Sequence, residues 1–385
     1  MAKNKNQSQI ATATVSKPPS KRRFEELDLS RSLPLLLLPL VHVYEEFESI
    51  DALPESILDG YSWILYLCNL MPSIFMILMG ANMYFSRRST AKDLFKRGLC
   101  FIGIGFALNF FRFIIPTIIT SIINGEPSAI IGEYGTLYYT LTPDIYDFVG
   151  LAFICFAIFK KFDFSPLAIL LSSVGLLTLD VIIPQFSTDI TFVDGFIGRF
   201  IYMDEDSCFP LSTWLIFPAI GYCFGYFYKN FETEEIRKKF VKRMFWTSLV
   251  GLLAIWFSLR EYDLDALLIM TSPANEYITD LPNVLMLTFL AGIWFAIFYF
   301  IYFKVKDTKT CKLLVTISKG ILPFYIAQWI IIGWAEYLPD GLVEDENRPF
   351  MGYGMFWALT IATIIISSIV TVIYQKRKES QKAKA

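Results

Sequence analysis

Long apolar stretches recur along almost the whole chain and constrain its fold more than any other feature. Each is about the 17–25 residues that a helix needs to cross a bilayer. Ten can be marked, at 28–46, 62–86, 97–121, 143–160, 166–183, 211–228, 243–260, 282–304, 312–336 and 354–374. Hydrophobic residues make up 55% of the chain and charged residues 18%, less charge than a soluble protein of this length would carry. The sequence therefore predicts an all-α, polytopic membrane bundle of about ten helices.

The loops between these stretches alternate in charge. Lys and Arg gather at 17–23, 87–97, 160–161, 229–243, 304–312 and 376–384, and acidic residues at 45–59, 126–133, 204–206, 261–280 and 340–346. By the positive-inside rule, both termini are expected in the cytoplasm and the acidic loops outside the cell membrane. We expect a disordered basic tail at 1–23, a membrane domain at 24–375 and a second basic tail at 376–385. The outer connection 184–210 is long enough to cover a site.

Cysteine and histidine usage narrows the chemistry. The six cysteines are scattered without a C-x-x-C pair, which argues against a zinc knuckle and a disulfide framework. A single histidine, His42, excludes a histidine-rich metal site and any mechanism that needs two histidines. We expect no metal and no nucleic-acid partner, and a homodimer is left open.

His42 lies in the first apolar stretch, eleven residues after Arg31. Eleven helical steps come to about three turns, so both side chains share one face, roughly 16 Å apart along the axis. Ionisable groups in a membrane helix are costly and suggest function. An imidazole suits general base work near neutral pH, although His42 could equally be a polar residue hydrogen-bonded within the bundle. Glu45 and Glu46 could orient it, or could begin an acidic outer loop.

Cationic residues at the predicted cytoplasmic ends suggest a phosphate-bearing ligand. Arg31 could grip the phosphates of a soluble donor, or could be a snorkelling anchor. Asp28 could pair with Arg31 or cap the helix, and Arg97 begins the third stretch on the same side. Three polar residues lie within later stretches, as substrate contacts or as contacts between helices: Asn109, Arg112 and Gln328.

The segment L-D-L-S-R-S-L-P-L-L-L-L-P-L-V-H at 27–42 resembles the first span of the transmembrane acyltransferases, whose hallmark is an arginine, ten residues and a histidine. This superfamily includes the acyltransferase 3 family and the heparan-alpha-glucosaminide N-acetyltransferase-like proteins. The chain is more similar to the second branch through M-P-S-I-F-M-I-L-M-G (71–80), L-F-K-R-G-L (94–99), P-D-I-Y-D-F-V-G-L-A-F (143–153), F-P-L-S-T-W-L-I-F-P-A-I-G-Y-C-F-G (209–225) and G-I-L-P-F-Y-I-A-Q-W (320–329). It departs from the pattern at Ser32, where glycine is usual, and at Gln328, where histidine is common.

The resemblance implies transfer of an acyl group from a cytoplasmic acyl-coenzyme A, usually acetyl-coenzyme A, to an acceptor across the membrane. The acceptor is expected to be a sugar or glycan. The implied roles are donor binding by Arg31, Arg97 and Asp28, catalysis by His42 with Glu45 and Glu46, and acceptor binding by Arg112, Asn109, Gln328 and Trp214. His42 could act as a general base or carry the acyl group itself.

Two other functions stay open. One is a transporter or flippase for a lipid or glycan, in which His42 and Arg112 would contact the substrate. Transporters often contain internal repeats, and none is visible in this sequence. The other is a non-catalytic member of the same family, for which the departure at Gln328 is the support.

Overall fold

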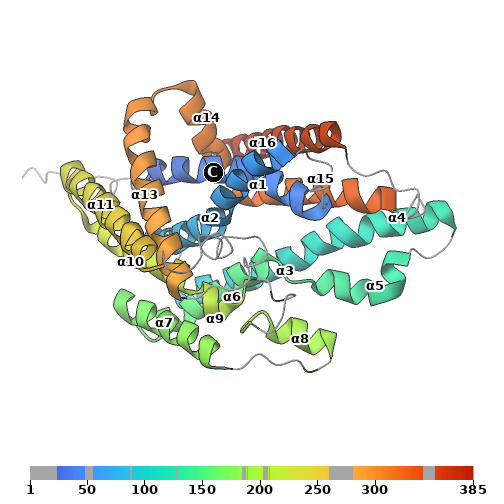
Figure 1. The fold of residues 1–385 in the computed structure, drawn as a ribbon, viewed down its shortest axis with the longest axis horizontal. Helices are drawn as coiled ribbons and strands as arrows, with labels where there is room; N and C mark the ends of the chain where they lie inside the picture. Colours follow the sequence, from blue (N-terminus) through green and yellow to red (C-terminus); the bar gives the residue numbers. More distant parts are fainter. Residues whose placement is uncertain are drawn as a thin grey trace, which may run out of the picture.

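The structure is a computed structural model that describes residues 24–47, 55–86, 89–125, 129–183, 188, 190–202, 207, 209–259, 281–340 and 352–384. All regular structure in these residues is helical (Figure 1). The helices are α1 (Glu25–Phe47), α2 (Glu55–Phe85), α3 (Ala91–Asn109), the π-helical turn η2 (Phe110–Ile114), α4 (Ile115–Asn124), α5 (Ala129–Leu141), α6 (Ile145–Lys161), α7 (Pro166–Ile182), α8 (Thr191–Ile197), α9 (Leu211–Trp214), α10 (Ile216–Asn230), α11 (Glu234–Leu259), α13 (Leu281–Val305), α14 (Lys309–Ser318), α15 (Ile321–Asp340) and α16 (Tyr353–Lys384).

The predicted all-helical fold is confirmed for the described residues, whereas the predicted number of ten spans is not. Five helices are long and apolar enough to cross a membrane, or six if the bent pair Gly135–Leu141 and Ile145–Lys161 forms one span. The prediction of one continuous span at 312–336 is wrong, because α14 ends at Ser318 and α15 begins at Ile321. The predicted tail at 1–23 lies outside the described residues, and α16 continues as a helix to Lys384.

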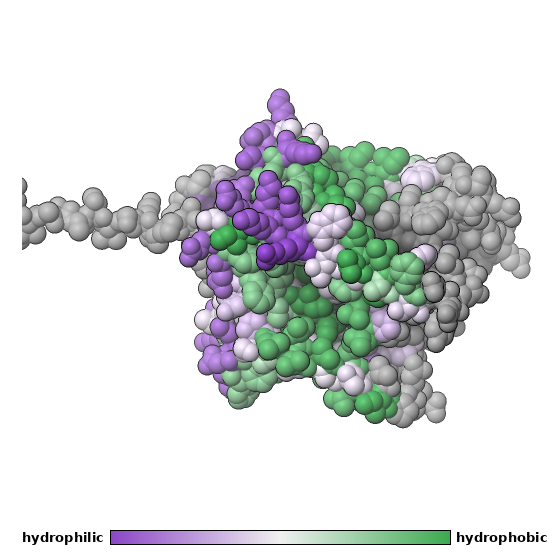
Figure 2. Space-filling view, turned by 60° about the vertical axis from the view of Figure 1, so that its left-hand side comes forward, coloured by the Kyte–Doolittle hydropathy of each residue, from purple (hydrophilic) through white to green (hydrophobic). Residues whose placement is uncertain are grey.

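The surface is that of a multi-pass membrane protein. Large apolar side chains face outward on many helices, as at Ile122 (75% exposed), Ile182 (69%) and Val250 (63%). Figure 2 shows hydrophobic side chains over much of one face, with the hydrophilic ones gathered separately. Lipid tails can cover such a surface, which would be unfavourable in water.

Small residues allow α3 and α6 to approach closely. A Cβ atom added at Gly98 would lie 2.6 Å from the carbonyl oxygen of Gly150, and one added at Gly150 would lie 2.8 Å from the oxygen of Gly98. Membrane helices commonly pack through such small residues because dispersion contacts then extend along both backbones. Further along the same pair, Gly105 faces Tyr146 and Asp147, so α6 presents its first turn beside the middle of α3.

Helix α1 lies among α2, α13, α14, α15 and α16, with which it makes its main contacts. It runs unbroken through Pro34 and Pro39. Buried positions continue along it from Leu27 to Val43, including Arg31 at 8% exposure. The polar stripe of α1 is therefore enclosed by protein rather than by lipid.

Candidate active site

A central cavity of about 1760 Å³ runs through the bundle and includes the polar stripe of α1. Six α1 residues on its wall follow helical spacing of three and four: Asp28, Arg31, Leu35, Leu38, His42 and Glu45. The predicted common face of Arg31 and His42 is confirmed. Pockets for drug-sized ligands measure roughly 300–1,000 Å³, so this cavity has room for a longer molecule.

Three side chains of α15 contact the imidazole of His42. The side-chain amide nitrogen of Gln328 lies 2.9 Å from Nδ1 of His42. The indole ring of Trp329 stacks on the imidazole at 4.2 Å between centroids, and Tyr325 meets it edge-on at 6.0 Å. Because Nδ1 is engaged by Gln328, the opposite ring nitrogen, Nε2, is the one available to a ligand.

Glu45 and Glu46 also line the cavity, about one turn beyond His42. At Nδ1 of His42 the hydrogen-bond partner is Gln328 of α15. An orienting role for Glu45 or Glu46 stays a prediction, and the two carboxylates make the wall acidic beyond the imidazole.

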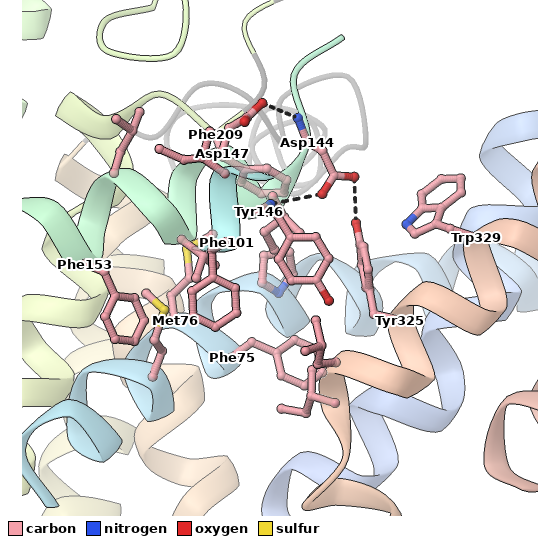
Figure 3. Close-up of a pocket in the computed structure, with 18 of the residues that line it drawn as sticks. Phe75, Met76, Phe101, Asp144, Tyr146, Asp147, Phe153, Phe209, Tyr325 and Trp329 are labelled. Carbon is pink, nitrogen blue, oxygen red and sulfur yellow. Dashed lines mark hydrogen bonds between the residues drawn. The ribbon is translucent and has the colours of Figure 1, made fainter. Parts of the chain in front are cut away.

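Asp144 is a buried carboxylate on the same wall, at the break between α5 and α6. Its Oδ1 accepts a hydrogen bond from the Tyr146 backbone N–H at 3.0 Å, and its Oδ2 accepts one from the Tyr325 hydroxyl at 3.2 Å (Figure 3). Asp147 completes a capping box by accepting from the Asp144 N–H at 3.3 Å. Helix capping thus places a carboxylate beside the aromatic group that packs on His42.

The connection predicted to cover a site contributes to the cavity wall through its described residues, among them Phe192, Phe196, Arg199 and Phe209. Arg199 donates to Asp147 Oδ2 at 3.2 Å and to the backbone oxygens of Leu141 and Gly195. One guanidinium therefore joins this connection to the ends of α5 and α6.

The other end of the cavity is cationic. Arg31 forms an ion pair with Asp28, which is one of the two roles expected for Asp28. Four basic side chains line this end: Arg31, Arg97, Lys319 and Lys382. Lys319 pairs with Glu25 at 2.7 Å, next to the start of α1, and Arg97 is exposed, 5.3 Å from the ring of Phe153. Figure 1 places the C-terminal end of α16, which carries Lys382, near α1 and α14.

Arg112 lies in the π-helical turn η2 and lines the cavity at 7% exposure. Its guanidinium carbon is 3.9 Å from the centre of the Phe113 ring and 4.1 Å from that of Trp329. Trp329 therefore contacts both Arg112 and His42. Helix α15 brings the two predicted site residues to one end of the cavity.

The other predicted acceptor contacts lie elsewhere. Asn109 donates from Nδ2 to the Thr142 carbonyl at 2.7 Å, which ties α3 to the end of α5. Trp214 is 2% exposed and packs against Phe209 and Phe217 in the core. Gln328 is fully buried and reaches His42 rather than the cavity surface. None of these three belongs to the cavity wall within the described residues.

Sequence reasoning missed several residues of the wall: Asp144, Tyr325, Trp329, Lys319 and Lys382. For Asp144 a signal was present, since P-D-I-Y-D at 143–147 places a capping Asp after Pro and a second Asp three residues later. The others have no comparable local signal. Within the described residues, no three His, Cys, Asp or Glu side chains are placed to hold a metal ion.

Comparison with known proteins identifies the family of the chain. A family described as heparan-alpha-glucosaminide N-acetyltransferase, catalytic, matches residues 23–260. No curated protein and no solved structure matches the chain. The family match includes Arg31, His42 and Arg112 and spans more than half of the 385 residues. The chain therefore belongs to the heparan-alpha-glucosaminide N-acetyltransferase catalytic family, within the transmembrane acyltransferase superfamily.

Proposed function

We propose that this protein moves an acetyl or similar acyl group from an acyl-coenzyme A on the cytoplasmic side to a hydroxyl or amine on the other side. The observation that carries the proposal is the shared wall of Arg31 and His42, which lie on one cavity in a family of membrane acetyltransferases. Roughly 16 Å of helix separates them, a distance that an extended pantetheine arm can bridge.

The cationic end of the cavity is the proposed donor site. Arg31, Arg97, Lys319 and Lys382 surround a space that a polyphosphate can enter, and charge-assisted hydrogen bonds to phosphate are among the stronger polar contacts. The ion pair with Asp28 holds Arg31 in place when the ligand is absent. The thioester then reaches inward, where the wall becomes aromatic.

His42 is the proposed general base. The acceptor nitrogen or oxygen attacks the carbonyl carbon of the thioester and forms the new bond, and the carbon–sulfur bond then breaks. Nε2 takes the acceptor's proton and passes it to the departing thiolate, so the products are the acylated acceptor and coenzyme A. A route through an acyl-histidine would use the same nitrogen, and labelled acetyl trapped on the protein without acceptor would identify it.

In the proposed mechanism Gln328 orients the imidazole of His42. General base work at Nε2 requires a proton on Nδ1, and so requires an acceptor facing Nδ1. A half-turn of the Gln328 amide exchanges its oxygen and nitrogen at the same position, so its carbonyl can accept this proton at the 2.9 Å separation. The departure from histidine at this position therefore still leaves the imidazole with a partner.

The proposed acceptor is a terminal amino sugar or a related glycan. The family takes its name from N-acetylation of a glucosaminide. Glu45 and Glu46 on the wall beyond His42 favour a neutral or cationic group approaching from that end.

The test is acetyl transfer from radiolabelled acetyl-coenzyme A in proteoliposomes, with a methyl glucosaminide and a methyl glucoside as acceptors. Wild type is expected to acetylate the glucosaminide, and His42→Ala and Arg31→Ala to lose most of that activity. Full activity in His42→Ala would remove the catalytic assignment. A wild type that neither binds nor consumes acetyl-coenzyme A would remove the enzyme assignment and favour a transporter.

Orientation is tested separately. Protease-sensitive tags at the two termini are expected to be cleaved only from the cytoplasmic side in sealed vesicles. Cleavage from the opposite side would put Arg31 away from the donor compartment and overturn its proposed role.

A further inference from the structure

The π-helical turn η2 interrupts a helix that otherwise runs from Ala91 to Asn124. Turns of this kind are rare, because they widen the helix, and they occur frequently at functional sites. Here the turn carries Arg112, a charge that is costly to bury within a membrane span. A contact made by this residue must offset that cost.

Contacts from α15 hold the turn and its arginine in place. Trp334 Nε1 donates to the carbonyl oxygen of Phe111 at 2.9 Å. A Cβ atom added at Gly333 would lie 2.4 Å from Cγ of Arg112, so only glycine leaves room for the arginine stem. With Phe113 and Trp329 both about 4 Å from its guanidinium, Arg112 is restrained before any ligand arrives.

The hydrogen-bonding capacity of Arg112 is not used up by the protein. Its Nε is buried without a hydrogen-bond partner, and no carboxylate among the described residues lies within ion-pair distance of its guanidinium. The nearby carboxylate of Asp144 is already engaged by Tyr146 and Tyr325. A restrained, desolvated guanidinium on the cavity wall points to an anionic ligand atom.

We infer that Arg112 is a catalytic residue that binds the oxyanion formed on the acyl carbonyl during transfer, an inference that rests on the proposed function. When the acceptor attacks, the electron pair of the carbonyl π bond moves to oxygen. The negative charge returns to re-form that bond as the carbon–sulfur bond breaks. The Arg112 N–H groups donate to this oxygen while Nε2 of His42 takes the acceptor's proton.

The position of Arg112 favours the oxyanion of the acyl carbonyl as its ligand over an anionic group of the acceptor. Arg112 and His42 both pack on the ring of Trp329, so the guanidinium and the imidazole belong to the same part of the cavity wall. An anionic acceptor entering beyond His42 would also pass Glu45 and Glu46. A preorganised donor aimed at charge that develops in the transition state contributes strongly to turnover.

The experiment compares wild type with Arg112→Gln and Arg112→Lys, and uses Lys92→Gln, an exposed residue outside the cavity wall, as the control. At saturating donor and acceptor, kcat of Arg112→Gln is expected to fall by about 10²–10³-fold. The Kd for acetyl-coenzyme A, measured by equilibrium binding, and the acceptor KM are expected to change less than about threefold, because these contacts do not involve the oxyanion.

Two further measurements separate a chemical role from a structural one. Guanidinium ion at millimolar concentration is expected to raise the turnover of Arg112→Ala, while urea at the same concentration is not. A trifluoromethyl ketone analogue of acetyl-coenzyme A, which hydrates to a tetrahedral centre, is expected to lose more affinity for Arg112→Gln than a thioether analogue without a carbonyl.

Several results would overturn the inference while wild type remains active. An unchanged kcat, a raised acceptor KM at constant kcat, or equal losses for the two analogues would each do so. If Arg112→Gln fails to fold, the same comparison is made with Arg112→Lys. The lysine ammonium keeps the positive charge but lacks the paired N–H donors of the planar guanidinium. A wild type that does not consume acetyl-coenzyme A marks failure of the proposed function instead.

Discussion

The two ends of the central cavity hold their charges differently. At the Arg31 end, four basic side chains come from three helices and the turn between α14 and α15, two of them are lysines, and Arg97 is exposed. At the His42 end, His42 and Arg112 both pack on one indole ring, and Gln328 contacts the imidazole from the buried side. One end has long basic side chains, two of them in ion pairs, and the other has groups packed on a single indole ring.

This difference fits two tasks in one cavity. Long basic side chains can follow a large phosphate-bearing ligand as it binds and leaves. Groups that act on developing charge or on a proton must instead be in position before the reaction, because reorganisation would raise the barrier. Substitutions at the Arg31 end should therefore affect affinity, and those at the His42 end should affect turnover.

The largest expected effect is at His42. Replacing it with Ala removes the proposed base, and kcat should fall by about 10²–10⁴-fold. Donor binding, measured with radiolabelled acetyl-coenzyme A, should remain within a few-fold of wild type. Loss of donor binding together with activity would show that the two ends do not act separately.

Substitutions at the Arg31 end are expected to weaken donor binding rather than to lower kcat. Arg31→Gln or Arg97→Gln should raise the KM for acetyl-coenzyme A by about 10–100-fold, since a hydrogen bond to a charged group contributes roughly 1.5–3 kcal/mol. Acetyl-pantetheine, which has no phosphates of its own, should be used equally by wild type and variants. A loss that persists with acetyl-pantetheine would place these arginines elsewhere in the reaction.

Gln328 should give a smaller effect on turnover. Gln328→Leu removes one hydrogen bond to the imidazole, so kcat should fall by about tenfold or less. Since His42 is the only histidine, ¹⁵N-histidine labelling observes its tautomer directly by NMR. Wild type should show the proton on Nδ1, and Gln328→Leu a mixture of tautomers. A proton on Nε2 in wild type would argue against the general base.

The smallest effect is expected at Gly333. A methyl group there would press on Arg112, and overpacking of this kind costs about 1–3 kcal/mol. Gly333→Ala should therefore lower both Tm in detergent and kcat. The matched control is Gly103→Ala, where an added Cβ meets nothing within 4 Å and helix propensity should slightly raise Tm. Equal behaviour of the two variants would contradict the close approach of α15 to η2.

The family was predicted from its resemblance to several motifs spread along the chain. Local patterns were enough to predict the all-helical fold, the membrane class and the common face of Arg31 and His42, because each depends on hydrophobicity or helical period within one stretch of sequence. The ion pair of Arg31 with Asp28 was predictable for the same reason, because positions three apart on a helix are neighbours.

Only the tertiary structure decided which groups surround His42. Gln328 and His42 are 286 residues apart, and their contact depends on α15 packing against α1 rather than on any local preference. The same packing decides that Trp329 joins Arg112 to His42, and that Asn109 and Trp214 lie off the cavity wall. Helical period determines which face a side chain occupies, whereas packing determines what that face meets.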